Sequence, residues 1–302
     1  MTAINEGRGT YPGPIINPDS TGMLWRSARY IKRNILYDLL LYPYGQKRHR
    51  QLTAEAERNN HHTHTSFYRS PGQLEALVGP VVQYLLQGRN PGKLIINIFA
   101  GSSGAEAYTM ASVLVHAFPG LDFHINCSDL HSDKVEEAKL ARFSLQQITQ
   151  GLPIPLLFLE KTFDRTGDCY TVKPGLSKHV SFSCSDIISG KLSEEYELAD
   201  IVCAQNVFCH MSNEMTTTAF YNVISTAKER SAVFIDGMNP DLRARLTTEV
   251  GLQPLEFKHK EIYQHARLHL SPAWWRYYYG REPYLFFKSD KLRRYSTIFL
   301  RG

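Results

Sequence analysis

A glycine-containing turn and an acidic residue stand where they could bind an adenosine-containing ligand. The apolar segment 94–99 runs into Ala-Gly-Ser-Ser-Gly at 100–104, where Gly101 would let the backbone approach a ligand closely. A helix beginning after this turn would offer free N–H groups. The next apolar segment ends at Asp129, and an acidic residue at that strand end can accept hydrogen bonds from ribose hydroxyls. Together these features predict an adenosine-containing cofactor.

The residues themselves leave two such cofactors open, NAD and S-adenosylmethionine. The strict G-x-G-x-x-G pattern of dinucleotide sites is absent from the turn. Glu106, just inside the helix, could instead pair with the ammonium group of a methionine. Asn206 follows the fourth apolar strand, where the crevice at the carboxyl ends of parallel strands would place it beside a reacting methyl group. This arrangement favours S-adenosylmethionine.

A series of short motifs resembles the chemotaxis-receptor (CheR) methyltransferase family. Residues 65–69 resemble the family's T-x-F-F-R signature, and 104–108 resemble its G-E-E-P-Y. The other motifs are 128–130 for T-D-I, 141–144 for G-x-Y-S, 186–188 for N-L-L and 205–207 for R-N-V, with Phe163, 170–173 and 180–182 similar to the family's small antiparallel subdomain. The resemblance covers about 63–239, in the family's order.

This resemblance implies a class I S-adenosylmethionine-dependent methyltransferase and a role for each matching residue. Arg69 would lie near the cofactor carboxylate, Glu106 would hold its amino group, and Asp129 its ribose. Asp186 would lie at the adenine, and Asn206 would line the methyl-transfer site. The predicted cofactor-binding residues are Thr63, Thr65, Arg69, Gly101, Glu106, Asp129, Asp186, Ile187, Asn206 and Val207.

Three positions depart from the family pattern. Thr63 replaces an Asn, Gln205 replaces the Arg before Asn206, and His210 replaces a Tyr. The last two positions face the substrate, so the resemblance supports the cofactor better than a receptor glutamate as acceptor. A carboxylate acceptor needs no base, whereas a hydroxyl must lose a proton, and an imidazole titrates near neutrality. His210 and Asn206 are therefore the predicted catalytic residues, with a purely structural His210 as the alternative.

The elements that must position these residues alternate between apolar strands and helices, as a mostly parallel sheet covered on both faces requires. A long segment, 144–179, breaks this alternation and is predicted to be a small antiparallel insert. The predicted strands are 94–99, 122–128, 180–184, 200–205 and 232–236, with an edge hairpin of 257–263 and 295–300. The predicted helices are 104–117, 133–142, 213–228 and 240–250.

The fold class is therefore predicted to be α/β, with a Rossmann-like class I methyltransferase sheet, the antiparallel insert and an N-terminal helical domain. Residues 1–22 are predicted to form a flexible lead-in. The helical domain spans 23–90 and contains an amphipathic helix over 24–39 and a helical stretch over 74–86. A Gly- and Pro-rich linker at 88–92 precedes the cofactor-binding domain, 91–302.

Composition narrows the classes of protein and partner. The five cysteines form no C-x-x-C pair, so we expect reduced thiols and a cytoplasmic protein. No signal peptide and no apolar run of about 18 residues is present, so no membrane span is expected. Adjacent imidazoles point apart, so the histidine cluster at 61–64 predicts no metal site. The aromatic and basic run 274–281 could stack on a planar substrate or pack as an anchor.

The leading functional hypothesis is O-methylation of a carboxylate or hydroxyl on a small-molecule acceptor. The first alternative is methylation of a protein glutamate, as in the chemotaxis-receptor family, and the second is a non-catalytic module that binds S-adenosylmethionine. Nucleic acid is not expected as a partner, because the net charge of +5 is modest and no Asn-Pro-Pro-Tyr follows the fourth strand.

Overall fold

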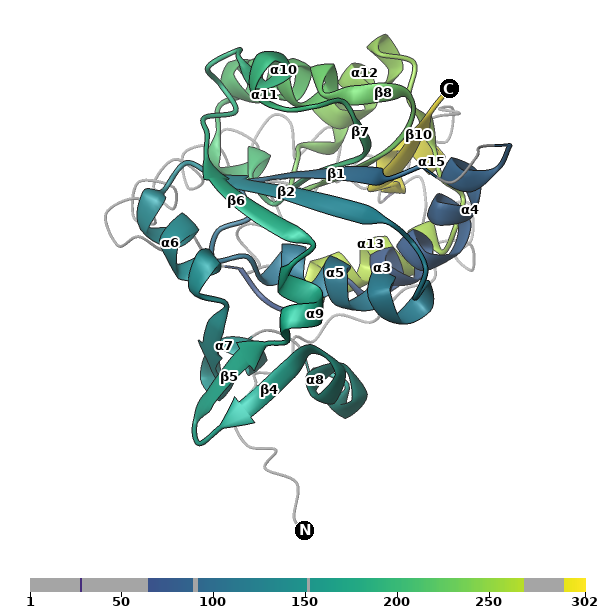
Figure 1. Ribbon diagram of the computed structural model, residues 1–302. Helices are drawn as coiled ribbons and strands as arrows, with labels where there is room; N and C mark the ends of the chain where they lie inside the picture. Colours follow the sequence, from purple (N-terminus) through teal and green to yellow (C-terminus); the bar gives the residue numbers. More distant parts are fainter. Residues whose placement is uncertain (1–27, 29–64, 89–91, 151–152, 269–290) are drawn as a thin grey trace.

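The computed structural model describes residues 65–88, 92–150, 153–268 and 291–302, together with Ala28. These residues form an α/β fold with one large sheet, helices on both faces and a small second sheet (Figure 1). This arrangement confirms the predicted α/β class with a Rossmann-like sheet and an antiparallel insert, whereas the N-terminal helical domain over 23–90 stays a prediction. The predicted amphipathic helix at 24–39, the histidine cluster at 61–64 and the aromatic run at 274–281 lie outside the described residues.

The large sheet has seven strands in the order β6-β2-β1-β7-β8-β10-β9, and the first five are parallel. β1 lies between β2 and β7, so the strand order reverses beside β1, and ligands bind at such switch points in open α/β sheets. The strands are β1 Leu94–Phe99, β2 Phe123–Asp129, β6 Val180–Cys184, β7 Ala199–Gln205, β8 Ala227–Asp236, β9 Gln253–Pro254 and β10 Ile298–Arg301.

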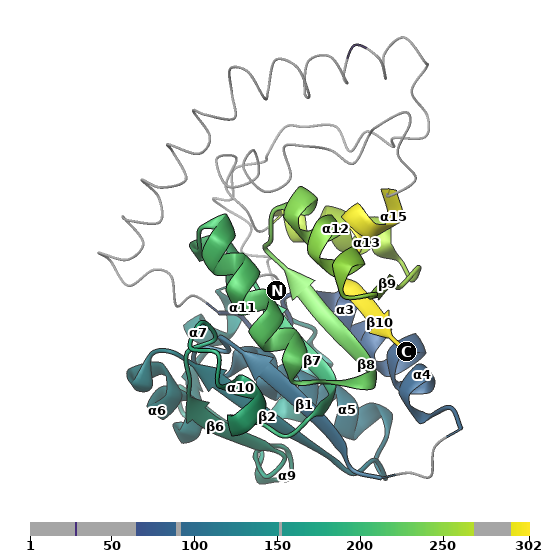
Figure 2. The ribbon, with the colours of Figure 1, turned by 90° about the horizontal axis from the view of Figure 1, so that it is seen from above.

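Two hydrophobic clusters fix the helices on the two faces of this sheet. On one face, Ile96 and Phe234 pack with residues of α3 Pro71–Ala76, η4 Leu77–Val81, α4 Val82–Leu86, α5 Ala105–Ala117 and α13 His259–Leu268. On the other face, Val202 and Val233 pack with α10 Leu192–Glu195, α11 Asn213–Ser225 and α12 Pro240–Glu249, and Figure 2 shows α11 crossing over β7. The main body also contains, within the described residues, α6 Ser132–Leu140, the short helix η5 Phe208–His210 and α15 Lys291–Tyr295.

The insert forms a three-stranded antiparallel sheet that projects from the rim of the large sheet (Figure 1). It begins two residues before the predicted boundary, because Arg142 to Ser144 already pair with β5. Ser144 then caps a helix reciprocally with Gln147. The elements are β3 Arg142–Ser144, α7 Leu145–Thr149, α8 Leu156–Thr162, β4 Phe163–Thr166, β5 Cys169–Val172 and α9 Pro174–Ser177, in the order β3-β5-β4.

The structure corrects three predictions of secondary structure. The helix predicted over 213–228 ends at Ser225, and β8 begins at Ala227 instead of at residue 232. The segment 257–263, predicted as a strand, belongs largely to helix α13, because Ile262 and Ala266 are buried at helical spacing. The edge of the sheet is formed instead by β9, which pairs with β10. The helical stretch 74–86 is interrupted at η4, where Gly79 leaves helical geometry before Pro80, a residue without an N–H group.

We predict that Gly101→Ala destabilises the protein by about 1–3 kcal/mol, because a methyl group at this position would overlap Cys127 Sγ in β2. Chemical denaturation measures the effect. Gly120→Ala is the matched control, since nothing lies within 4 Å of its added methyl group. Equal stability of the two variants would contradict the close approach of the turn to β2.

Candidate functional site

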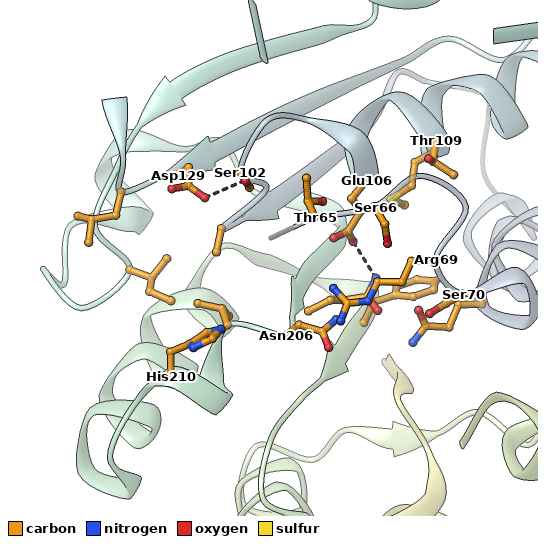
Figure 3. Close-up of a pocket in the computed structure, with 18 of the residues that line it drawn as sticks. Thr65, Ser66, Arg69, Ser70, Ser102, Glu106, Thr109, Asp129, Asn206 and His210 are labelled. Carbon is orange, nitrogen blue, oxygen red and sulfur yellow. Dashed lines mark hydrogen bonds between the residues drawn. The ribbon is translucent and has the colours of Figure 1, made fainter. Parts of the chain in front are cut away.

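A pocket of about 410 Å³ opens at the carboxyl ends of the parallel strands beside β1 (Figure 3). This volume lies in the range of small-molecule sites. Its wall combines acidic, basic and apolar side chains from the turn after β1, the loops after β2, β6 and β7, and the segment before α3. The pocket therefore lies at the predicted position in the sheet.

The turn after β1 is shaped by backbone conformations that few residues adopt. Ala100 and Ser102 have positive φ angles of 59° and 51°, and Gly104 has 86°. The Ser102 N–H donates to Asp129 Oδ2 at 2.7 Å, and the His131 N–H donates to Oδ1 at 3.0 Å. Two backbone donors thus hold the Asp129 carboxylate at the pocket, and each carboxylate oxygen keeps a lone pair for a ligand.

Glu106 lies in the first turn of α5, deep in the protein but with one side on the pocket. Gln205 Nε2 donates a hydrogen bond to Glu106 Oε1 at 2.7 Å. Burial raises the pKa of the Glu106 carboxyl to about 7, although the hydrogen bond from Gln205 and the positive charge of Arg69 both lower it. A ligand ammonium would supply the compensation that this carboxylate lacks.

Arg69 crosses the middle of the pocket between Glu106 and Asn206 (Figure 3). It follows Tyr68, whose φ of 52° turns the chain toward the pocket. Thr65 and Ser70 line the same wall. A guanidinium placed beside a buried carboxylate suits a ligand that carries both an ammonium and a carboxylate.

A second tight turn presents the residues predicted to face the acceptor. Asn206, directly after β7, has a φ of 57°, and a methyl group at Gly237 would lie 2.7 Å from Asn206 Cα. Glycine at 237 therefore lets the loops after β7 and β8 meet. The short helix η5, Phe208–His210, follows and brings His210 to the pocket wall. Cys209 beside it is buried, which raises the pKa of its thiol to about 12 and argues against a nucleophilic role.

The loop after β6 closes the pocket near Asp129. The Ile188 N–H donates to Asp186 Oδ1 at 2.9 Å, which fixes the direction of that side chain. Ile187 is buried and packs into the core on the α11 side of the sheet. Both residues line the pocket.

The structure brings most of the predicted site residues into this one pocket. They are Thr65, Arg69, Glu106, Asp129, Asp186, Ile187, Asn206, Val207 and His210. Gly101 lies in the turn but not on the pocket wall, since its missing side chain accommodates Cys127. Thr63 lies outside the described residues.

Sequence reasoning missed several residues of the pocket wall. Ser102 acts through its backbone N–H, which no side-chain pattern reveals. Gln73 and Thr109 line the pocket on α3 and α5 and are 2% and 3% exposed, so their spacing indicates only a helical core. Gln205 differs from the arginine of the family pattern. That difference was the one feature of the sequence that marked this position, but it did not reveal the hydrogen bond to Glu106.

Candidate metal clusters and candidate membrane helices are both absent from the described part of the chain. No cluster of three or more His, Cys, Asp or Glu side chains suited to a metal occurs there. Among the helices in those ranges, none has the length and apolar character needed to cross a membrane.

Comparisons with known proteins agree with this geometry. Residues 63–253 match the family model described as CheR methyltransferase, SAM binding domain. A chemotaxis protein methyltransferase of Listeria monocytogenes is 24% identical over 173 residues, which cover 57% of this chain and 63% of that protein. Chemotaxis protein methyltransferase 2 of Vibrio cholerae is 26% identical over 169 residues, 53% of this chain and 57% of that protein. The chain thus spans less than two thirds of these relatives' lengths.

Among solved structures, magnesium protoporphyrin IX methyltransferase from Synechocystis with bound SAM aligns with a TM-score of 0.35 and 16% identity, covering 61% of this chain and 71% of that one. The family match extends over more than half of the chain and includes every predicted site residue. The chain therefore belongs to the CheR methyltransferase family, and the cofactor of its matched domain is S-adenosylmethionine.

Proposed function

We propose that this protein transfers the methyl group of S-adenosylmethionine to an oxygen atom of a small-molecule acceptor. One observation carries the proposal: a single pocket holds a half-buried carboxylate, a guanidinium and a second carboxylate at a strand end. This set matches an ammonium, a carboxylate and the hydroxyls of a ribose. The acceptor side is lined by Asn206 and His210.

Each side chain has a distinct task in the proposed complex. Glu106 binds the ammonium, Arg69 the carboxylate and Asp129 the ribose hydroxyls, while Asp186 lies at the adenine. The bound cofactor supplies a methyl group activated by a sulfonium. The protein's contribution to such an in-line displacement is mainly positioning and exclusion of water. Asn206 and His210 then orient the acceptor oxygen, and His210 accepts a proton if the acceptor is a hydroxyl.

Two features favour a small acceptor. Gln205, at the family's Arg position, donates to Glu106 and adds no positive charge that would attract an acidic protein side chain. The pocket also continues past Arg69 toward Ser70 and Thr109, on the opposite side from Asp129 (Figure 3). Gln73 and Phe234, both 2% exposed, line the pocket as well, so it reaches into the protein interior.

Methylation of a protein glutamate is the second candidate, because the matched relatives are named chemotaxis protein methyltransferases. An incubation with methyl-labelled S-adenosylmethionine distinguishes the two functions. The acceptor is either a panel of metabolites or membranes that contain chemotaxis receptors. Label in a metabolite supports the proposal. Label only in receptor protein, released as methanol by mild base, would replace it with glutamate methylation.

We predict that cofactor affinity falls as the pH decreases through about 7, because the raised pKa of Glu106 lets it bind a proton in place of the ammonium. The carboxylate form is present above pH 7 and lost below it, so affinity should drop about tenfold from pH 8 to pH 6. Calorimetric titration with S-adenosylmethionine at several pH values measures this. Glu106→Gln should bind weakly at every pH, and a pH dependence that persists in that variant would exclude Glu106 as its source.

We predict that His210→Gln lowers kcat for a hydroxyl acceptor by about 10²–10⁴, because the amide can form hydrogen bonds but cannot take the proton. The cofactor dissociation constant should stay unchanged. Rates at saturating acceptor, with calorimetric affinities in parallel, separate the two effects. An unchanged kcat would mean that His210 is structural or that the acceptor is already an anion.

A further inference from the structure

We infer that the three-stranded insert helps to form the cofactor-binding site, because it holds in place the segment 65–70, which brings Thr65 and Arg69 to the pocket. The inference rests on the proposed function, in which Arg69 binds the amino-acid end of the cofactor. The insert thus positions the segment 65–70, and Gln150 and Phe158 are the positioning residues.

The segment 65–70 has neither helix nor strand structure. No ladder of backbone hydrogen bonds can therefore hold it, and its position must come from other contacts. It nevertheless includes Ser66 and Phe67, which are 5% and 1% exposed. An irregular segment that is this well buried needs strong anchors on the elements around it.

The first anchor is aromatic. The Phe67 ring packs edge-on against Phe143 of β3, with centroids 4.8 Å apart, and against Phe163 of β4, with centroids 5.1 Å apart. The neighbouring Tyr68 ring lies 5.0 Å from Phe158 of α8. All three partners belong to the insert. Such pairs contribute beyond the burial of their area, so they define where residues 67 and 68 lie.

The second anchor is polar and holds the other end of the segment, at Thr65. Gln150, which ends α7, donates from Nε2 to the Thr65 backbone oxygen at 2.7 Å. The Tyr68 N–H donates to Thr109 Oγ1 in α5 at 3.2 Å. Thr65 is thus tied directly to the insert, and Arg69 follows a residue tied to both the insert and the main body.

The two ends of the proposed cofactor site consequently differ in how far they depend on the insert. At the amino-acid end, Glu106 belongs to α5 of the main body, whereas Thr65 and Arg69 lie on the segment that the insert holds. Asp129 ends β2 and Asp186 lies in the loop after β6. Their carboxylates accept hydrogen bonds from backbone N–H groups of the main body, those of Ser102, His131 and Ile188. Thr65 and Arg69 depend on the insert. Loosening the insert should therefore weaken ligands that carry the amino-acid group and spare ligands that lack it.

The experiment compares Gln150→Ala with Gln146→Ala, an exposed glutamine on the same helix for which the structure shows no side-chain hydrogen bond. The probes are S-adenosylhomocysteine, which has the amino-acid group, and 5′-methylthioadenosine, which has the adenosine and thioether without it. Calorimetry of the full chain should show about two- to tenfold weaker S-adenosylhomocysteine binding for Gln150→Ala alone, which is the worth of one hydrogen bond. Binding of 5′-methylthioadenosine should be unchanged in both variants.

A second pair of variants tests the aromatic anchor. Phe158→Leu should weaken S-adenosylhomocysteine selectively, and Phe158→Tyr, which keeps a ring against Tyr68, should restore it. Equal loss of both probes in Gln150→Ala and Phe158→Leu would mean general loosening and overturn the inference. Normal S-adenosylhomocysteine binding by both variants would also overturn it. Absence of S-adenosylhomocysteine binding by the unsubstituted protein would instead overturn the proposed function, and the inference with it.

Discussion

The reversal of strand order beside β1 is the constraint on which the pocket depends. Because β2 and β7 lie on opposite sides of β1, the loops that leave their carboxyl ends separate and leave a crevice. The turn after β1 lines this crevice, and its approach to β2 requires glycine beside Cys127. Asp129, Glu106 and Asn206 converge there because three neighbouring parallel strands end at one edge.

The pocket replaces a positive charge of the family pattern with a neutral donor. A second arginine, at position 205, would add to the Coulomb attraction of Arg69 that favours the charged form of Glu106, whereas the Gln205 amide offers one hydrogen bond at 2.7 Å. Burial of the Glu106 carboxyl outweighs the compensation from Gln205 and Arg69, so its charged form is costly in the empty protein, and a bound cation would relieve that cost. The same burial of Glu106 therefore favours binding of an ammonium and lowers the stability of the protein without its ligand.

Sequence patterns predicted the central sheet well because its strands and helices obey strong periodicities. β6 matches its predicted limits. β2 is shifted by one residue at both ends, and β7 begins one residue earlier than predicted. The failure at 257–263 arose because Phe257 and Tyr263 suggest a strand, while burial of Ile262 and Ala266 shows a helix. In the site, charged side chains in ordered motifs could be predicted. Backbone donors such as Ser102, and contacts between distant residues such as Gln150 with Thr65, carry no local signal.

The buried hydrogen bond from Gln73 Nε2 to Thr297 Oγ1, at 2.8 Å, joins residues 224 positions apart. During synthesis on the ribosome, Gln73 emerges long before its partner, roughly 10–45 s earlier at usual elongation rates. Until then, β10 cannot pair with β8, and the pocket wall formed by Gln73 lacks its support from the end of the sheet. The nascent chain can therefore form β1, β2 and the insert early, but Gln73 gains its support in the pocket wall only after the segment around Thr297 has been translated.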